Sequence, residues 1–379
     1  MGRKIWLLVA LMLLLGALPV QAATLDVAGK SAVLMDVATG KVLYENNAHE
    51  ALPPASVTKV MTMLLIMEAI DSGKIGWDDM VTASEAAAAK GGSQIYLKVG
   101  ETMSVTDMVK SIAVSSANDC ACAMAEHIAG SESAFVQMMN ARARELGMND
   151  TNFVNCTGLD DGEEAKDHKT SAYDIGIMSR QLLKYHPEIK KFTTIWMDTV
   201  RDGTFGLANT NKLVRFYKGT TGLKTGYTSK AGFCLAATAQ RSGMELIAVV
   251  LGSETSQERF QSCKQMLDYG FANYALIHPA PEEGHTVPVT LGKQPTVTAV
   301  PSEQTAFLID KAQLSQVKIN VSMDVAVAAP VSKGQRLGTM TISAGGQVLR
   351  QIPMVATESV QKKGFLDVFK DILRKLAMG

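Results

Sequence analysis

Strand-like segments at both ends of residues 25–275, with helical segments between them, constrain the fold of this chain most. "KSAVLMDVATGKVLYENN" predicts two β-strands joined by a turn at Thr39 and Gly40, because apolar and β-branched residues flank the glycine. Two apolar strands, "AGFCLAATAQ" and "MELIAVVLG", follow late in this region, and a helix from about Ser256 to Tyr274 comes after them. This order predicts an α/β fold in which an antiparallel sheet is built from both ends of the domain and a helical cluster is inserted between them.

The middle of this region contains apolar segments with helical spacing. "PPASVTKVMTMLLIMEAIDSG" has prolines before it, Ser56 near its start, an apolar interior and Gly73 after it, which predicts a buried helix. "SVTDMVKSIAV", "ANDCACAMAEHIAG" and "ESAFVQMMNARARELG" predict three more helices. Ser56 is therefore expected at the N-terminus of the first buried helix.

The composition changes near "HPAPEEGH". Short β-type runs from Val287 to about Val360 predict a small all-β domain. The tail "KKGFLDVFKDILRKLAMG" places Phe365, Phe369 and Ile372 on one helical face and charged residues opposite, which predicts an amphipathic helix. We therefore expect three units after residue 22, a larger domain, a β domain and an amphipathic helix, at residues 23–276, 277–360 and 361–379.

The C-terminal amphipathic helix is a candidate membrane contact. It would span only ~22 Å and it carries charges, so it should lie in a membrane interface and not cross it. Four cations in and beside it favour anionic lipid: Lys362, Lys363, Lys370 and Arg374. The alternative is that the apolar face docks onto the β domain or onto a partner protein.

The N-terminus has the pattern of a signal peptide. Arg3 and Lys4 precede an apolar run from Ile5 to Leu18, and small residues follow at Val20 and Ala22. A retained membrane anchor is the alternative, but the run is shorter than the ~20 residues that span a bilayer comfortably. We expect residues 1–22 to be removed and the protein to act at the outer face of the cytoplasmic membrane, in a periplasm or cell-wall space.

Composition excludes some classes of partner. The chain has 37 basic and 37 acidic residues, so no net positive field favours nucleic acid. Its five cysteines are an odd number without a disulfide framework, and its six histidines are scattered without metal-ligand spacing. We expect no metal and no other cofactor.

A Ser-x-x-Lys pattern occurs three times, at Ser56–Lys59, Ser315–Lys318 and Ser359–Lys362. Only the first begins a buried helix and is followed by a Ser-x-Asn element, "SSAN", and a Lys-Thr-Gly element, "LKTG". Taken singly, each element has a structural explanation: a helix N-cap, a turn between helices, or a turn before a strand. Together and in this order they are typical of penicillin-binding proteins and class A β-lactamases.

The chemistry of the first two elements is consistent with acyl transfer. A serine hydroxyl becomes nucleophilic when a base takes its proton, and Lys59, one helical turn after Ser56, can be that base if it is neutral. Neutrality requires that Lys59 be desolvated or repelled by another cation, for which Lys224 is a candidate. Ser116 can relay a proton to the leaving amine, and Asn118 can bind the substrate amide.

The third element suits a substrate with a free carboxylate. Lys224 provides positive charge, Thr225 provides a hydroxyl, and Gly226 lets a substrate backbone approach the strand edge. The three elements together predict a serine acyl-transfer site that accepts a peptide C-terminus.

The chain resembles the D-alanyl-D-alanine carboxypeptidase family, the serine-type, low-molecular-mass penicillin-binding proteins. The three motifs carry the resemblance, and "NCTGLDDGEEAKDHKTSAYDIGIMSR" and "GLKTGYTSKAGFCLAATA" extend it. It implies a β-lactamase/DD-peptidase-like domain, then a β domain and a membrane anchor. It also implies an enzyme that removes the terminal D-Ala from peptidoglycan stem peptides ending in D-Ala-D-Ala and that β-lactam antibiotics acylate.

The resemblance also assigns roles to individual residues. It implies that Ser56 is the nucleophile and Lys59 the base, with Ser116, Asn118 and Lys224 completing the catalytic set. The implied oxyanion hole consists of the backbone N–H groups of Ser56 and Tyr227, where relatives often have His in place of the tyrosine. Arg259 matches an arginine that lies near the substrate carboxylate in relatives, and Lys212 and Arg215 are the cations nearest to a second such position.

Three other functions remain to be compared with this one. A class A β-lactamase adds a Glu-x-x-x-Asn pattern, which is missing from "DDGEEAKDHKT". A DD-endopeptidase that cleaves cross-links would use the same catalytic set. A catalytically silent wall-binding protein would not need the intact set. Cys120, just after Asn118, is expected near the site, so a thiol reagent should slow acylation.

Overall fold

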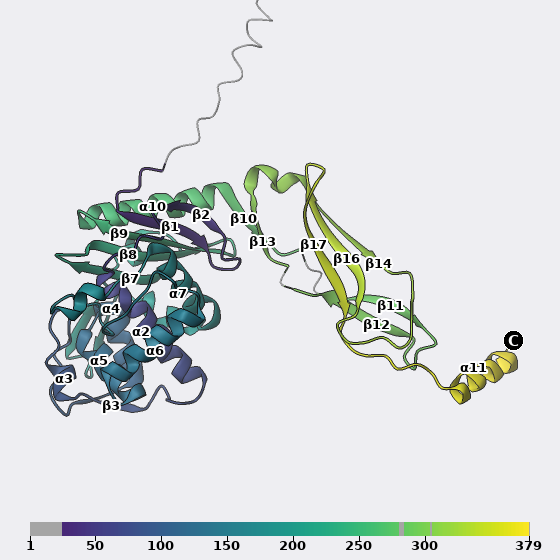
Figure 1. Ribbon diagram of the computed structural model, residues 1–379, viewed down its shortest axis with the longest axis horizontal. Coiled ribbons are helices and arrows are strands. Elements are labelled where there is room, and N and C mark those ends of the chain that lie inside the picture. Colours follow the sequence, from purple (N-terminus) through teal and green to yellow (C-terminus); the bar gives the residue numbers. More distant parts are fainter. Residues whose placement is uncertain (1–24, 280–283, 304, 379) are drawn as a thin grey trace, which may run out of the picture.

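The computed structural model describes residues 25–279, 284–303 and 305–378. The predicted signal peptide, residues 1–22, lies outside the described residues. The described chain has a larger α/β domain, then an elongated β domain, then a short helix at the far end (Figure 1).

A five-stranded antiparallel sheet crosses the larger domain in the order β2-β1-β9-β8-β7. Its strands are β1 (Ser31–Asp36), β2 (Val42–Asn46), β7 (Thr220–Thr228), β8 (Gly232–Arg241) and β9 (Met244–Ser253). β1 pairs with β9 so that Ser31 lies opposite Leu251, which brings the two ends of the domain together. This confirms the predicted sheet, and it leaves β7 at one edge.

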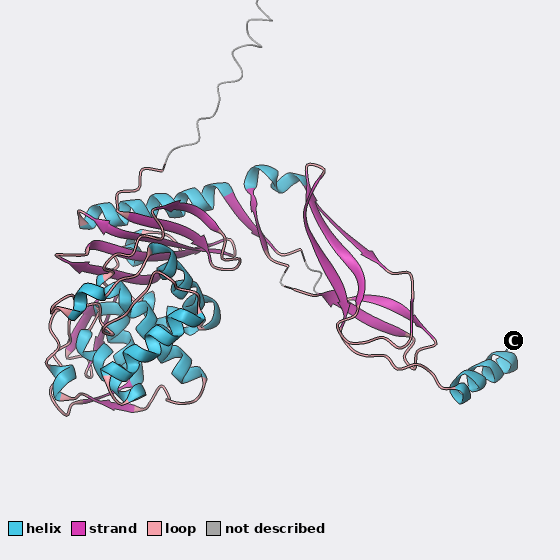
Figure 2. Cartoon of the chain, in the orientation of Figure 1, coloured by secondary structure: helices cyan, strands magenta, loops and turns pink. Residues whose placement is uncertain are grey.

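Both faces of this sheet are covered by helices (Figure 2). Along β1, Val33 packs into the core of the helical cluster, whereas Ala32 and Leu34 pack on the opposite face. The opposite face is covered by α10 (Ser256–Asn273). The helical cluster and the turns around it contain α2 (Lys59–Asp71), α3 (Glu85–Ala88), α4 (Val105–Ser115), α5 (Asn118–Ala129), α6 (Glu132–Glu145), α7 (Ala172–Tyr185), α8 (Lys190–Thr193), α9 (Leu213–Phe216), and the 3-10 turns η1 (Ala55–Thr58), η2 (Glu164–Asp167) and η3 (Pro187–Ile189).

Two short two-stranded sheets beside the helical cluster were not predicted. β3 (Met80–Thr82) pairs with β4 (Thr102–Ser104), and β5 (Met197–Val200) pairs with β6 (Phe205–Ala208). These strands are three or four residues long, so they are too short for an alternating pattern of apolar residues to identify them.

The second domain is all-β, as predicted. A six-stranded sheet has the order β14-β16-β17-β12-β11-β15, and β10 and β13 form a separate pair. Alternate residues of β16, such as Met340 and Ile342, point into one apolar core. The strands are β10 (Tyr274–Ile277), β11 (His285–Thr290), β12 (Thr296–Pro301), β13 (Phe307–Asp310), β14 (Val317–Met323), β15 (Val327–Ala328), β16 (Arg336–Ala344) and β17 (Gln347–Ala356), and the 3-10 turn η4 spans Lys311–Gln316.

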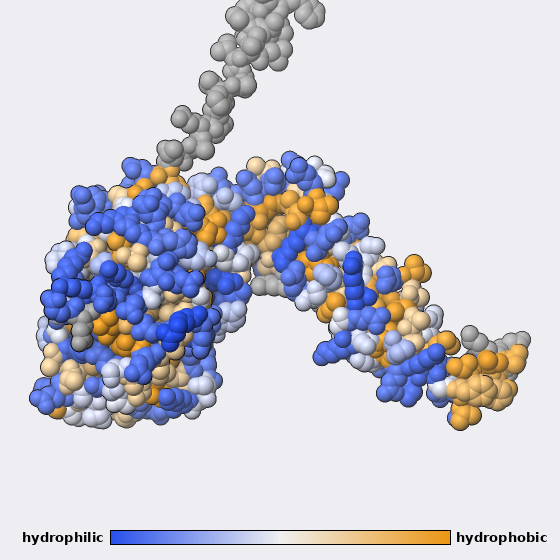
Figure 3. Space-filling model, viewed as in Figure 1, coloured by the Kyte–Doolittle hydropathy of each residue, from blue (hydrophilic) through white to orange (hydrophobic). Residues whose placement is uncertain are grey.

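The predicted C-terminal helix is α11 (Phe365–Met378). It extends from the end of the β domain that is far from the larger domain, and the side of it that Figure 3 shows is largely apolar (Figures 1 and 3). Phe365 is 84% exposed and Leu376 is 75% exposed, so this face does not pack onto the β domain. Within the described residues, no helix is both long and apolar enough to cross a bilayer.

Candidate active site

Ser56 lies in the 3-10 turn η1, immediately before α2. The turn begins with Ala55 in the left-handed region, at a φ of 48°, which is a strained conformation for alanine. Neither η1 nor α2 has a side-chain N-cap hydrogen bond, so Ser56 does not serve as a helix cap. Its side chain is half-buried, and its hydroxyl is available for chemistry.

Lys59 is the first residue of α2 and is completely buried. Its Nζ donates hydrogen bonds to Ser56 Oγ, at 2.9 Å, and to the backbone oxygen of Thr157, at 2.7 Å. Burial lowers the pKa of Lys59 to about 7, although the nearby Cys156 and Asp119 act in the opposite direction. Of the two expected causes of neutrality, burial is therefore the principal one.

The Ser-x-Asn element forms the junction between α4 and α5. Ser116 is buried and adopts a left-handed conformation, with a φ of 63°. Asn118 Nδ2 donates to the backbone oxygen of Gly91 at 2.7 Å, while its buried Oδ1 has no protein partner. No hydrogen bond in the described part of the chain joins Ser116 directly to Ser56 or Lys59.

The Lys-Thr-Gly element lies on the edge strand β7, which packs beside η1. A side chain at Gly226 would place its Cβ 2.7 Å from the backbone oxygen of Pro54 and 3.0 Å from the backbone nitrogen of Ser56. Only glycine allows this close approach of the strand to the serine turn. Thr225 Oγ1 donates to Thr210 Oγ1 at 2.6 Å, and the side chain of Tyr227 is 56% exposed.

Lys224 and Arg259 add two more buried cations to the site. Lys224 is 1% exposed and donates to the backbone oxygen of Thr225 at 2.9 Å. Its pKa is lowered well below the ordinary value, first by burial and then by the charges of Lys59 and Arg259. Lys59 and Lys224 repel each other when both are charged, and this repulsion adds to the effect of burial on the pair. A carboxylate bound here would offset the cost of charging it.

Arg259 lies behind β7 and β8 on α10. Its Nη1 donates to the backbone oxygens of Gly226, at 2.7 Å, and Cys234, at 3.2 Å. The guanidinium also stacks over the rings of Phe233 and Phe260. These contacts hold Arg259 against the back of the strand that carries Gly226.

Comparison with known proteins identifies the family. Residues 19–255 match the family described as D-alanyl-D-alanine carboxypeptidase. This chain belongs to that family. Residues 275–362 match the family described as penicillin-binding protein 5, C-terminal domain. The expected serine-type D-Ala-D-Ala carboxypeptidase, with its two-domain fold, is thereby confirmed.

Individual members of the D-alanyl-D-alanine carboxypeptidase family match most of the chain. D-alanyl-D-alanine carboxypeptidase DacF of Bacillus subtilis is 47% identical over 90% of this chain and 88% of its own length. The crystal structure of penicillin binding protein 5 from Haemophilus influenzae matches with a TM-score of 0.76 and 31% identity, over 92% of this chain and all of that one. Penicillin-binding protein D2 of Listeria monocytogenes, in its ampicillin-bound form, matches with a TM-score of 0.57 and 32% identity, over 65% of this chain and 99% of that one.

Two residues that shape this carboxypeptidase site were missed from the sequence. Gly158, with a φ of 84°, packs against the serine turn so closely that a Cβ would lie 1.8 Å from the backbone oxygen of Ala55. Its neighbour Thr157 provides the backbone oxygen that binds Lys59. The segment "NCTGLD" that contains both was noticed only for its family resemblance.

His168 also supports the serine turn and was not predicted to do so. Its Nδ1 accepts a hydrogen bond from the backbone N–H of Val154, so its Nε2 carries the proton and donates to Thr58 Oγ1 at 2.7 Å. Thr58 Oγ1 in turn donates to the backbone oxygen of Ala55. Burial, together with the charge of Lys59, lowers the pKa of His168 to about 4, so the ring is neutral at neutral pH.

The expectation for Cys120 needs correction, and the structure places Lys212 and Arg215 in other surroundings. Cys120 is fully buried, and burial together with Asp119 raises its pKa well above the ordinary value, so its thiol is protonated and inaccessible to reagents. Arg215 stacks on the rings of Trp196 and Phe216. Lys212 lines a surface cavity with residues of α10. In the described part of the chain, neither side chain makes a hydrogen bond to Ser56, Lys59 or Lys224.

Proposed function

We propose that this enzyme removes the terminal D-Ala from peptidoglycan pentapeptide stems through an acyl-enzyme on Ser56. The single observation that carries the proposal is the 2.9 Å hydrogen bond between Ser56 Oγ and the buried Nζ of Lys59. Because the pKa of Lys59 is about 7, a large fraction of this amine is neutral at neutral pH. The neutral amine accepts the Ser56 proton as Oγ attacks the carbonyl carbon of the penultimate D-Ala.

The backbone N–H groups of Ser56 and Tyr227 stabilise the oxyanion that forms in this attack. The close approach of Gly226 to the backbone nitrogen of Ser56 supports this assignment, since it brings the two backbones together. The side chain of Tyr227 is not needed for this role.

Ser116 passes the proton from Lys59 to the leaving D-Ala nitrogen. Asn118 accepts a hydrogen bond from the substrate amide, and its unpartnered Oδ1 supports this role. Lys224 and Thr225 bind the terminal carboxylate, which restores the charge of Lys224 when substrate arrives. Arg259 adds positive charge from behind and positions Gly226 through its hydrogen bond to the strand.

β-Lactams acylate the same serine in this proposal, because their strained amide replaces the D-Ala-D-Ala peptide bond. The ampicillin-bound relative from Listeria monocytogenes supports it. The match over 90% of the chain to a carboxypeptidase favours this function over the endopeptidase and the silent wall-binding protein.

Release of free D-Ala from a diacyl-D-Ala-D-Ala peptide by residues 23–379 tests the function. The wild-type protein should release D-Ala and take up fluorescent penicillin, and Ser56→Ala should do neither. Ser315→Ala, which changes the serine of a second Ser-x-x-Lys pattern, is the matched control and should behave like the wild type. Label on Ser56→Ala would refute the nucleophile, and labelling without D-Ala release would favour the endopeptidase.

We also infer how the chain is organised and where it acts. Residues 1–22 direct export and are removed, residues 23–276 form the peptidase domain, and residues 277–360 form the β domain. The protein then acts at the outer face of the cytoplasmic membrane. The basic and apolar pattern of the first residues supports this, and mass spectrometry of the exported protein should find Ala23 as its first residue.

Residues 361–379 hold the enzyme at the membrane surface in this proposal. The exposed apolar side chains of α11, among them Phe365 and Phe369, support it, because an apolar face of this kind binds a lipid interface. Phe369→Ser should weaken binding to phospholipid vesicles of any headgroup. Equal binding of this variant and the wild type would contradict the proposal.

A further inference from the structure

The start of α11 is fixed to the tip of the β domain by backbone hydrogen bonds. Lys363 N donates to the backbone oxygen of Leu291, and Lys293 N donates to that of Gln361, each at 2.8 Å. Gly292 and Lys362 form an isolated antiparallel bridge between these bonds. The loop between β11 and β12 therefore holds a fixed position beside the first turns of the helix.

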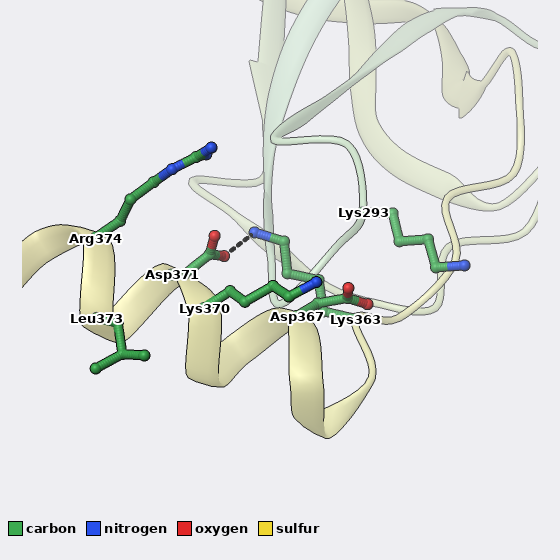
Figure 4. A pocket seen from close by; sticks show the side chains of 7 residues that line it. All are labelled: Lys293, Lys363, Asp367, Lys370, Asp371, Leu373 and Arg374. Carbon is green, nitrogen blue, oxygen red and sulfur yellow. Dashed lines mark hydrogen bonds and ion pairs between the residues drawn. The ribbon is translucent and has the colours of Figure 1, made fainter.

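A basic cavity of about 890 Å³ opens between this loop and α11 (Figure 4). Its charged lining consists of four cations and two carboxylates: Lys293, Lys363, Lys370, Arg374, Asp367 and Asp371. Asp371 pairs with Lys363. No ion-pair partner is seen for Lys293, Lys370 or Arg374 within the described residues, so the cavity has an excess of positive charge.

The cavity lies on the polar side of an amphipathic helix. In Figure 4, Lys370 and Arg374 extend on the side of α11 that carries Asp371, whereas Leu373 points away from that side. When the apolar face of such a helix is buried by ~5–10 Å at the boundary between acyl chains and headgroups, its polar side lies level with the lipid phosphates. The cations of the cavity are then at the depth where anionic lipid carries its charge.

We propose that this cavity binds the phosphate of an anionic phospholipid headgroup. This inference rests on the proposed membrane binding of α11 and adds a specific partner to it. Lys370 and Arg374 approach the phosphate from the helix, and Lys293 approaches it from the β domain. The tip of the β domain is therefore part of the membrane-binding surface, and the loop fixes how the domain stands on the lipid.

Charge complementarity favours an anionic phospholipid headgroup as the ligand of this cavity. A zwitterionic headgroup brings its own ammonium group into a cavity that already has excess positive charge. Its electrostatic binding free energy is therefore less favourable than that of an anionic headgroup. An acidic protein would match the charge, but the exposed apolar side chains at the cavity match acyl chains: Leu373, which is part of the lining, is 50% exposed, and Ile372 is 51% exposed.

Vesicle flotation with residues 23–379 tests the proposal. The vesicles are pure phosphatidylcholine, or phosphatidylcholine with about one third phosphatidylglycerol, at a fixed salt concentration. Lys293→Gln removes the cation from the β-domain loop without changing α11. It should lower the partition coefficient on anionic vesicles about fivefold, since each basic residue near the surface contributes about that factor, and it should not change binding to neutral vesicles.

Lys333→Gln is the matched control, because Lys333 is an exposed lysine beside Ser359, at the same end of the β domain as α11, and does not line the cavity. It should bind like the wild type, and all variants should keep wild-type D-Ala release from a soluble peptide. Equal losses for Lys293→Gln and Lys333→Gln would indicate general charge attraction and overturn the site. Inorganic phosphate should not displace the protein from vesicles more than chloride of equal ionic strength does. If it did, the cavity would be a site for free phosphate, and the headgroup proposal would be overturned.

The two membrane proposals fail in different ways in this experiment. If Phe369→Ser loses binding on both kinds of vesicle while Lys293→Gln matches the wild type, membrane binding stands and the headgroup site fails. If neither variant differs from the wild type on either vesicle, both fail.

Discussion

At the scale of single residues, the proposed mechanism depends on a lysine, Lys59, whose pKa is lowered to about 7 by burial. Lys59 is surrounded by protein, and its ammonium form would lose most of its hydration there. The position is costly for folding and useful for chemistry, because a base near pKa 7 can accept a proton at neutral pH and return it later. Lys224, which is also buried, lies near enough to be affected by its charge.

The rate of acylation by penicillin should rise with pH. In the proposed mechanism the neutral form of Lys59 is the active base, so the rate should increase about tenfold between pH 6 and pH 8 and level off above, as expected for a pKa of about 7. Stopped-flow or gel-based labelling with fluorescent penicillin measures this. Lys212→Gln, a change to an exposed lysine outside the site, should keep the profile. A rate that is constant from pH 5 to pH 9 would contradict Lys59 as the base.

Gly158→Ala should reduce acylation at least about a hundredfold. Its Cβ would lie 1.8 Å from the backbone oxygen of Ala55, so the serine turn must move. A displacement of about 1 Å in a reacting group lowers the reaction rate about a hundredfold. Gly162→Ala is the control, because Gly162 also has a positive φ but has nothing within 4 Å of its Cβ position. If both variants lost labelling rate equally, backbone strain at a positive φ, and not the contact with Ala55, would be the cause of the loss.

At the scale of elements, the serine turn is held from three sides. β7 approaches through Gly226, the segment after α6 approaches through Gly158, and His168 reaches the turn through Thr58. The strained φ of Ala55 persists because these neighbours fix the backbone around it. Ser56 and Lys59 are thereby held in place relative to each other.

Thr58→Val should weaken this support. It leaves the Nε2–H of His168 and the backbone oxygen of Ala55 without their partner, which costs about 1–3 kcal/mol of stability. We expect a lower melting temperature and acylation slower by about tenfold. Thr106→Val, which removes one hydrogen bond to Trp77 in the first turn of α4, should lower stability without slowing acylation. Unchanged acylation in Thr58→Val would show that the turn does not need this network.

Much of this arrangement could be predicted from sequence, and the rest could not, for physical reasons. The strands and α2 have long apolar runs with clear ends, and Ser56, Asn118 and Gly226 lie in short motifs of known chemistry. Gly158 and His168 act through contacts between segments far apart in the chain, which no local pattern encodes. How much burial and how much repulsion contribute to the pKa of Lys59 likewise depends on how completely the protein encloses the site.

At the scale of the whole molecule, the peptidase domain and α11, the proposed membrane contact, lie at opposite ends of the described chain (Figure 1). The β domain lies between them, with its own apolar core. Changes to α11 are therefore expected to alter where the enzyme works and to leave its chemistry unchanged.

Removal of residues 364–379 tests this separation. The truncated protein should release D-Ala from a soluble peptide at a rate within about twofold of the wild type, because α11 makes no contact with the peptidase domain in the described structure. It should lose binding to vesicles. Removal of the whole β domain is not an equivalent control, since β10 and η4 pack against α10. A large loss of activity on the soluble peptide would contradict the separation.

The pairing of β1 with β9 has a consequence for how the chain acquires its structure. A ribosome releases the chain from its N-terminus, so β1 has only β2 as a neighbour until the residues up to Ser253 have been made. The central sheet cannot close before then, and pairings between such distant segments form slowly. A newly made chain thus stays open for most of its synthesis, as the proposed export would require, and its central sheet is complete only after β9 has been made.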